Sequence, residues 1–315
     1  MAAVSGLQRG TAVRRRSRRS THEAIEGYLL ISPWIVGFLC FTLGPMLASL
    51  YFSFTQYNVI TAPRFIGLAN YVRAFSGKDL LFYPSLARTL EFAALYAPAG
   101  VALSLLLAIL LNRQLAGVSL FRTLFFMPTL TPIAATALLW TWLLQPDVGP
   151  VNYLLGQIGV QGPRWLASEQ WALPTLVVAT LWGSVGGSRM IIFLAGLQGV
   201  PQELYEAANI DGANWWQRLR HVTLPMISPV TFFLVILTAI AALRVFALAF
   251  IATNGGPDYA TWFYLLHLYN TAFQSFYMGY ASALAWVFFV LVLAFTFLQF
   301  RFARRWVHYG GQKES

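Results

Sequence analysis

Six long apolar stretches dominate the pattern of hydrophobic and polar positions along the chain. They do not alternate between apolar and polar residues as half-buried strands do, and each approaches the roughly 20 residues that a helix needs to cross a bilayer. We expect spanning helices at 28–54, 86–111, 121–144, 173–197, 228–253 and 278–300. The pattern predicts an all-α, polytopic membrane protein with about six transmembrane helices.

The composition fits a bilayer as the solvent. Of the 315 residues, 58% are hydrophobic and only 10% are charged, whereas soluble domains carry about 25% charged residues. So few charges leave too little polar surface to face water on all sides. We therefore expect lipid to cover most of this chain.

The basic residues indicate the orientation, since Lys and Arg in short loops stay on the cytoplasmic side. Six arginines precede the first predicted span, and basic residues also follow the last span and occupy the second–third and fourth–fifth loops. Both termini are therefore predicted to be cytoplasmic, in the plasma (inner) membrane. The net charge of +10 follows from this topology, so no nucleic acid is needed as a partner.

The same pattern divides the chain into regions. Residues 1–27 form a basic arm that we expect to be disordered, 28–305 form the membrane domain, and 306–315 form a tail. A short helix is expected at 68–75, and Pro98-Ala99-Gly100 and the stretch from Pro128 to Pro132 permit irregular backbone. No GxxxxGK[ST] phosphate loop occurs in the sequence, so any ATP and Mg²⁺ must belong to a partner.

The loop at 198–227 predicts two short helices around a glycine turn. Pro201 suits a helix start, Gly212 suits a left-handed end, and Asn214 suits the cap of a second helix that runs from Trp215 to about Val222. Leu224-Pro225 is expected to end that second helix. The loop would then lie across the cytoplasmic face.

One side of the first of these helices contains two adjacent alanines. Leu204, Ala207, Ala208 and Asp211 share it by their spacing of three and four residues, and Glu203 and Glu206 lie in the first turns. Two adjacent alanines make a knob that fits a cleft in another protein. From the residues alone, a helix that merely links two spans remains the alternative.

The loop also resembles a known motif. Glu206-Ala207-Ala208, Gly212, Val222 and Leu224-Pro225 are similar in spacing to the "EAA" loop of ABC importer permeases, with Val222 where that family often has Ile. The resemblance implies a type I ABC importer permease fold and a loop that docks on an ATPase subunit. The coupling residues it implies are Glu203, Leu204, Glu206, Ala207, Ala208, Asp211, Gly212, Leu224 and Pro225.

Other stretches resemble the carbohydrate-importing branch of that family, which handles maltose, trehalose and glycerol phosphate. They are Gly67-Leu68-Ala69-Asn70-Tyr71, Phe121-Arg122 through Pro128, Gly255-Gly256-Pro257 with Thr261, and Gly279-Tyr280-Ala281-Ser282-Ala283. The resemblance implies a second homologous permease, an ATPase dimer and an extracytoplasmic solute-binding protein. It implies that the external turn of Asn254, Gly255, Gly256 and Pro257 contacts the binding protein.

Two arginines fall inside predicted spans, where charges are costly and usually face a cavity or a partner. We expect Arg244 and Arg189 to line a sugar path, with Trp182 and Trp140 as aromatic candidates for sugar faces. The alternative for each arginine is a structural bond to backbone or side chains. Glu91 is expected to pair with Arg88 or Arg244.

A membrane-embedded lipid-linked glycosyl- or phosphotransferase is the alternative function. Such enzymes need clustered acids or histidines at a membrane face, and the 11 acids and four histidines here are scattered without metal-ligand spacing. We expect a transport subunit with no catalytic residues, no metal site and no cofactor of its own. The sequence leaves open which sugar or sugar phosphate it carries, and whether the permease pair is a homodimer or a heterodimer.

Overall fold

The first compact unit is one apolar helical stretch. The computed structural model describes residues 18–113, 117–303 and 307, and it divides into the units Met1–Tyr51 and Phe52–Ser315. The first unit holds α1 (Arg18–Phe38), the π-helical turn η1 (Leu39–Leu43) and most of α2 (Gly44–Ser53). Pro45 has no N–H to donate, and the wider turn before it closes with the Gly44 N–H on the Leu39 carbonyl.

This stretch confirms the first predicted span and changes the picture of the arm. Ile25–Ser53 is long and apolar enough to cross a membrane. The helix begins at Arg18, so the later part of the arm predicted to be disordered is helical. The earlier part, 1–17, and the predicted tail, apart from Val307, lie outside the described residues.

The second unit opens with a small hairpin and is built around α4. Strands β1 (Thr55–Gln56) and β2 (Arg64–Phe65) pair antiparallel with Thr55 opposite Phe65, and α3 (Ala69–Phe75) follows where a short helix is predicted. Helix α4 (Phe82–Leu111) packs against α8, α9, α13 and α15. It is continuous through Pro98, so the irregular backbone that Pro98-Ala99-Gly100 permits does not occur there: the proline removes one hydrogen bond without ending the helix.

The third predicted span is two helices set at 95°. Helix α5 (Val118–Leu130) and α6 (Ile133–Leu143) meet at Thr131-Pro132. Thr131 has extended backbone angles, as the residue before a proline prefers. The break therefore lies inside the stretch from Pro128 to Pro132 where irregular backbone is predicted.

The fourth predicted span is also broken, which the sequence analysis did not foresee. Helices α8 (Glu169–Ser184) and α9 (Ser188–Gln198) meet at 55°. The two glycines of the junction have no room for a side chain: a Cβ on Gly186 would lie 2.0 Å from the Phe125 carbonyl oxygen, and one on Gly187 would lie 2.5 Å from the Thr129 hydroxyl. Close approach of α5 explains why glycines stand at this bend.

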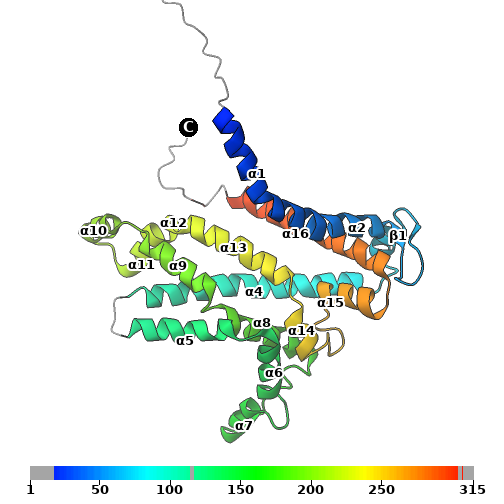
Figure 1. Ribbon diagram of the computed structural model, residues 1–315. Helices are drawn as coiled ribbons and strands as arrows, with labels where there is room; N and C mark the ends of the chain where they lie inside the picture. Colours follow the sequence, from blue (N-terminus) through cyan, green and yellow to red (C-terminus); the bar gives the residue numbers. More distant parts are fainter. Residues whose placement is uncertain (1–17, 114–116, 304–306, 308–315) are drawn as a thin grey trace, which may run out of the picture. The chain divides into compact units, whose positions relative to one another are not determined.

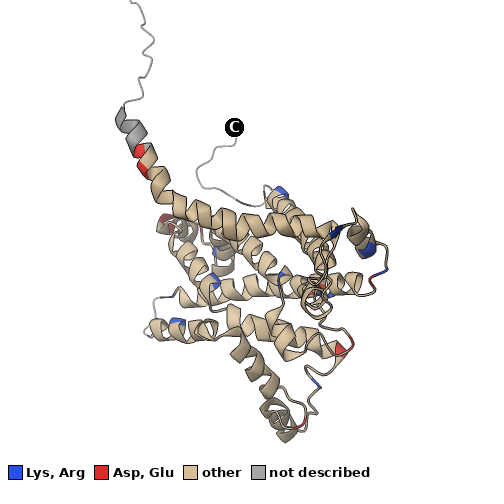
Figure 2. Ribbon diagram, turned by 45° about the vertical axis from the view of Figure 1, so that its right-hand side comes forward, with Lys and Arg blue, Asp and Glu red and all other residues tan. Residues whose placement is uncertain are grey.

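The remaining elements complete the second unit (Figure 1). They are α7 (Pro150–Gln157), α10 (Gln202–Ile210), α11 (Trp215–Arg218), η2 (Leu219–Thr223), α12 (Leu224–Met226), α13 (Ser228–Leu243), α14 (Ala247–Ala252), α15 (Tyr264–Tyr269), η3 (Asn270–Gln274) and α16 (Met278–Ala303). Four described helical stretches are long and apolar enough to cross a membrane, and the total is six if each of the two bent pairs is one span. Figure 2 shows long stretches of these helices without a charged residue.

The second unit has two distinct ends. In Figure 1, α10 and α11 lie at one end of α4 and α13, and α15 lies toward the other. A core cluster that includes Leu111, Leu197 and Ile227 fills the first end, and one that includes Phe92 and Phe263 lies toward the second. The loop at 198–227 and the turn after α14 are therefore on opposite ends, as the predicted topology requires.

Candidate functional site

A cavity of about 630 Å³ lies among the broken helices of the second unit. Its walls come from α4, α5, α6, α8 and α13 to η3. Aromatic rings and hydroxyl groups share the lining, which includes Phe92, Tyr96, Thr136, Ser184, Phe246 and Tyr269. Rings and hydroxyls together are the groups that bind the faces and edges of a sugar.

Arg244 lines this cavity at a third helix break. Helix α13 ends at Leu243, and α14 begins at Ala247, so Arg244 stands where the backbone leaves the helix. Its own N–H still bonds the Ile240 carbonyl at 3.2 Å, and its side chain is exposed. The structure therefore places Arg244 in the lining of this cavity, and its contact with a sugar stays a prediction.

Arg189 lies in a different setting. Its guanidinium is buried and donates to the Ser184 hydroxyl at 2.6 Å, to the Tyr96 hydroxyl at 3.1 Å and to the Thr238 hydroxyl at 3.2 Å. These bonds tie α9 to α8, α4 and α13 across the bend. Gly100 leaves the space for the guanidinium, because a Cβ there would lie 2.8 Å from Nη1. The contacts favour the structural alternative for Arg189.

The two tryptophan candidates stand outside the cavity lining. Trp140 and Trp182 pack edge to face, with ring centroids 6.1 Å apart. Trp140 packs against the core cluster around Phe92 and Phe263 and lines a separate small pocket near Trp165. The structure therefore does not bring these two rings together with Arg244, and contact of either ring with a substrate stays a prediction.

The loop at 198–227 forms the predicted helix–turn–helix. Gly212 has φ +76°, the left-handed region, and ends α10. The Ala213 N–H bonds the Ala208 carbonyl at 2.9 Å, and the Gly212 N–H bonds the Asn209 carbonyl at 3.0 Å. This is the paired bonding of a Schellman end, which a glycine allows at little cost. Pro201 stands at the cap just before α10.

The second helix of the loop is capped as predicted but runs further. The Asn214 side chain accepts from the Gln217 N–H at 2.9 Å, and the Gln217 side chain accepts from the Asn214 N–H at 2.8 Å. The helical path then continues through η2 and α12 to Met226, so an end at Leu224-Pro225 is wrong. The π-helical turn just before accommodates the missing N–H of Pro225.

Helix α10 is held by one side and presents the other. The Tyr205 and Thr223 hydroxyls lie 3.0 Å apart, and Arg218 donates to Asn209. Glu203, Leu204, Glu206, Ala207 and Asp211 are exposed, while Ala208 is half-buried beside Tyr205. Helix α10 is therefore anchored to α11 and η2 on one side, and its opposite side is exposed.

The turn after α14 is tightly built at the opposite end. Asn254 and Gly255 have positive φ, and the Gly256–Pro257 bond is cis. The Thr261 hydroxyl donates to the Gly256 carbonyl at 2.8 Å and lies 2.7 Å from the Thr253 hydroxyl. These bonds explain the spacing of Gly255-Gly256-Pro257 and Thr261, and contact with a binding protein stays a prediction.

Comparison with known proteins identifies the family. The sequence model of the binding-protein-dependent transport system inner membrane component family matches residues 100–308, more than half of the chain. The chain belongs to this family.

Relatives over nearly the full length agree. The probable ABC transporter permease protein YesP of Bacillus subtilis is 40% identical over 97% of this chain and 99% of its own length. The trehalose/maltose transport system permease protein MalF of Thermococcus litoralis is 34% identical over 91% and 97%. The sn-glycerol-3-phosphate transport system permease protein UgpA of Agrobacterium fabrum is 33% identical over 90% and 96%.

Solved structures agree on the fold. A chain of a bacterial ABC transporter involved in the import of the acidic polysaccharide alginate matches with a TM-score of 0.79 at 24% identity, over 91% of this chain and 99% of that one. The same transporter in complex with its alginate-pentasaccharide-bound periplasmic protein contains a chain that matches with a TM-score of 0.81. The expected ABC importer permease fold is confirmed, and the protein is an inner-membrane transport component.

The branch motifs of this permease have structural explanations. The buried Asn70 amide donates to the carbonyls of Ser53 and Thr55, both at 2.9 Å, and ties α3 to the end of the first span. Arg122 donates to the Leu111 carbonyl at 2.8 Å, where the negative end of α4 favours a cation. Gly279 lies against β1, because a Cβ there would be 2.1 Å from the Thr55 carbonyl oxygen.

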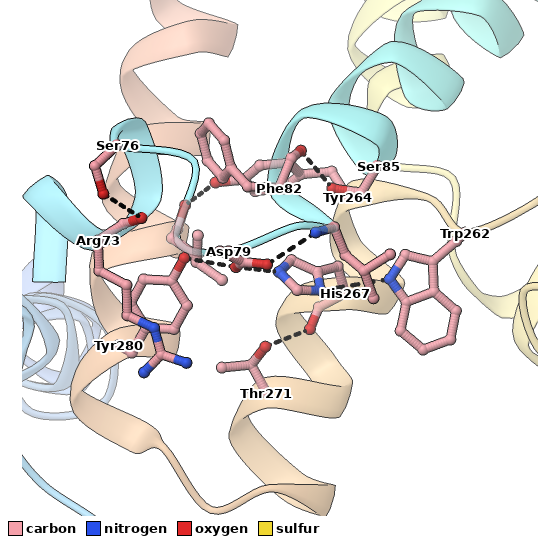
Figure 3. Close-up of polar contacts among 12 residues, drawn as sticks. Arg73, Ser76, Asp79, Phe82, Ser85, Trp262, Tyr264, His267, Thr271 and Tyr280 are labelled. Carbon is pink, nitrogen blue, oxygen red and sulfur yellow. Dashed lines mark hydrogen bonds and ion pairs between the residues drawn. The ribbon is translucent and has the colours of Figure 1, made fainter. Parts of the chain in front are cut away.

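The permease also contains a buried polar cluster that the sequence analysis missed (Figure 3). The Asp79 carboxylate accepts from the Tyr280 hydroxyl at 2.6 Å and lies 2.8 Å from His267 Nε2. Trp262 Nε1 donates to His267 Nδ1 at 3.4 Å, so Nε2 carries the proton and donates to Asp79. Asp79 and His267 are 188 positions apart, and no local pattern in the sequence joins them.

Electrostatics in this cluster favour an ionised Asp79. Burial disfavours the charged carboxylate, but the hydrogen bonds from Tyr280 and His267 and from the Leu81 N–H outweigh it and hold the pKa of Asp79 below its usual value. The cluster joins the start of α4 to α15 and α16, and Trp262 packs against Gly255 in the turn after α14. The cluster therefore holds the turn after α14 in position.

Of the two expected partners of Glu91, the structure pairs it with Arg88. Arg88 Nη1 lies 2.9 Å from Glu91 Oε2 on the surface of α4. Arg244 is left without a carboxylate in the described part of the chain.

Proposed function

We propose that the protein is one permease of an ATP-driven, binding-protein-dependent sugar importer in the plasma (inner) membrane, with both termini cytoplasmic. The single observation that carries this proposal is helix α10, which is exposed on one side, is anchored through Tyr205 and ends at Gly212. The names of the relatives, which include trehalose/maltose and glycerol-phosphate permeases, support a sugar or sugar phosphate as the cargo.

The proposed partners follow from what this chain contains. A second homologous permease would complete the cavity, and an ATPase dimer with ATP and Mg²⁺ would receive α10. An extracytoplasmic solute-binding protein would deliver the sugar at the end that holds the turn of Asn254 to Pro257. The chain's own part is to bind and release the sugar in alternation.

Helix α10 is placed to pass motion into the membrane. From Trp215 the helical path continues through η2 and α12, and the Thr231 N–H still bonds the Ile227 carbonyl at 2.9 Å where α13 begins. Helix α13 then leads to Arg244 at its far end. A displacement of α10 by the ATPase would therefore tilt the helix that carries the one charge of the cavity lining.

Site-directed crosslinking tests the docking of α10. In a Cys40→Ser background, which removes the single cysteine of the sequence, Ala207→Cys is expected to crosslink to the ATPase subunit in native membranes. Ala167→Cys, an exposed alanine in the α7–α8 connection, is the matched control and should not. A crosslink from both positions, or from neither, would contradict docking through α10.

A charge reversal gives a second readout. Glu206 is exposed in α10, and Glu206→Lys is expected to weaken recovery of the ATPase during affinity purification and to lower uptake, while the amount of this chain in the membrane stays unchanged. Full ATPase recovery and full uptake in this variant would remove Glu206 from the coupling residues.

A further inference from the structure

The cavity carries one fixed positive charge and no fixed negative charge among its described lining residues. Arg244 is the cation, and the lining includes no Asp, Glu or Lys. The other polar groups are hydroxyls of threonines, Ser184, Tyr96 and Tyr269. A low-dielectric cavity of one sign concentrates anions and repels cations.

Arg244 differs from Arg189 in having no partner of its own. Arg189 makes three hydrogen bonds to hydroxyls, whereas no hydrogen bond or ion pair of the Arg244 guanidinium is present in the described part of the chain. The C-terminal end of α13 favours a cation here, with a partial charge of about half an electron. That partial charge offsets only part of the charge of the arginine, so a net positive charge remains in the cavity lining.

The surroundings of Arg244 suit a small ring-shaped ligand. Phe246 and Tyr269 line the same cavity as Arg244, and their ring centroids lie 5.3 Å apart. The volume of about 630 Å³ lies within the range of roughly 300–1,000 Å³ that small-molecule sites occupy. This volume is large enough for a mono- or disaccharide.

We propose that the cargo is an anionic saccharide and that Arg244 binds its carboxylate or phosphate group. This inference rests on the proposed function as a sugar importer and narrows it. A guanidinium presents a planar fork of donors that matches both anions in two parallel hydrogen bonds. A neutral sugar would leave the guanidinium without an ionic partner and would forgo the charge-assisted hydrogen bonds that an anion accepts.

Uptake of matched sugar pairs tests the charge. The complete importer, purified with its binding protein and placed in proteoliposomes with ATP, is supplied with digalacturonate or α-1,4-galactobiose, which differ at C6 only, and with sn-glycerol 3-phosphate or glycerol. We expect the anionic member of a pair to accumulate about tenfold or more faster than its neutral counterpart. The two pairs distinguish a carboxylate from a phosphate.

Variants assign the effect to this residue. Arg244→Gln is expected to lower uptake of the anionic sugar about tenfold or more, with partial recovery in Arg244→Lys. Arg88→Gln, which removes a surface arginine that already has a partner in Glu91, is the matched control and should transport normally.

The outcomes separate the possible failures. Faster uptake of the neutral member, or full uptake by Arg244→Gln, overturns the anionic cargo and leaves sugar import standing. Loss of the second permease from the purified Arg244→Gln complex would mean that a carboxylate of that subunit pairs with Arg244, which also overturns the proposal. Uptake of neither member of the pairs, together with no uptake of any sugar that the binding protein binds, would overturn sugar import itself.

Discussion

Arg189 and Arg244 both fall in apolar stretches of the sequence, where a charge is costly. The structure gives the two side chains different neighbours. Arg189 fits because Gly100 has no side chain and because hydroxyls of Tyr96, Ser184 and Thr238 accept from it. Arg244 stands at a helix end with its side chain exposed. The sequence could show that both lie in apolar stretches, but only the packing shows which charge is satisfied.

The fit of Arg189 against α4 gives a prediction for Gly100→Ala. A Cβ would lie 2.8 Å from Arg189 Nη1, so the guanidinium must move and give up hydrogen bonds. The lost hydrogen bonds cost about 1–3 kcal/mol, which is expected to outweigh the roughly 1 kcal/mol that alanine gains over glycine within a helix, so the melting temperature in detergent should fall. Gly156→Ala in α7, where a Cβ meets nothing within 4 Å, is the control and should not lower it. Equal melting temperatures for Gly100→Ala and wild type would sink the argument.

At the scale of single elements, the turn that ends α10 gives the sharpest prediction. Gly212 has φ +76° in open space, and a β-branched residue there costs about 1–2 kcal/mol in the left-handed region. Gly212→Val is expected to loosen the end of α10, to reduce recovery of the ATPase and to lower uptake.

A matched variant separates this effect from general strain. Gly77 also has φ +76° with nothing near its Cβ position, but it follows α3 in the predicted external segment. Gly77→Val carries the same backbone strain and should keep ATPase recovery and uptake. Equal defects in the two variants would show that strain alone, not the coupling loop, explains the loss.

The contact of Asp79 with His267, which anchors α15, predicts that the stability of the protein depends on pH. The pKa of Asp79 is lowered in the folded protein, so its contribution to stability is complete above its ordinary value near 3.8 and is lost as the pH falls through the lowered value. Asp79→Asn is expected to lower the melting temperature at pH 7, with the difference narrowing below about pH 4. Asp147→Asn, at an exposed loop position, is the control. A difference that stays constant with pH would contradict the role of the carboxylate.

An element could be predicted from the sequence where its cause lies in neighbouring residues, and not where its cause is a contact between distant segments. The long apolar runs, the proline break after α5, Gly212 and Asn214 act locally, and the structure bears them out. The bend at Gly186 and Gly187 exists because α5 crosses there, and α15 with His267 is only six residues long. Such features depend on contacts between distant segments, so no window along the sequence contains them.

At the scale of the whole molecule, the account joins two ends of one helical path. The fixed base of α10 and the helical stretch into α13 connect a proposed ATPase contact with Arg244 in the cavity. The chain belongs to the transport-permease family, relatives match it over nearly its full length, and it has the fold of an ABC importer permease. Transport experiments test the proposed cargo and the proposed coupling of ATP hydrolysis to sugar movement.

Reconstituted transport tests the central claim most directly. The complex purified through this chain is placed in proteoliposomes with its solute-binding protein and a labelled sugar that the binding protein binds. The account predicts accumulation that requires ATP hydrolysis, the binding protein and this chain together, and that is lost in Gly212→Val. Accumulation without ATP, driven by an ion gradient, or no sugar accumulation at all with an active ATPase present, would contradict it.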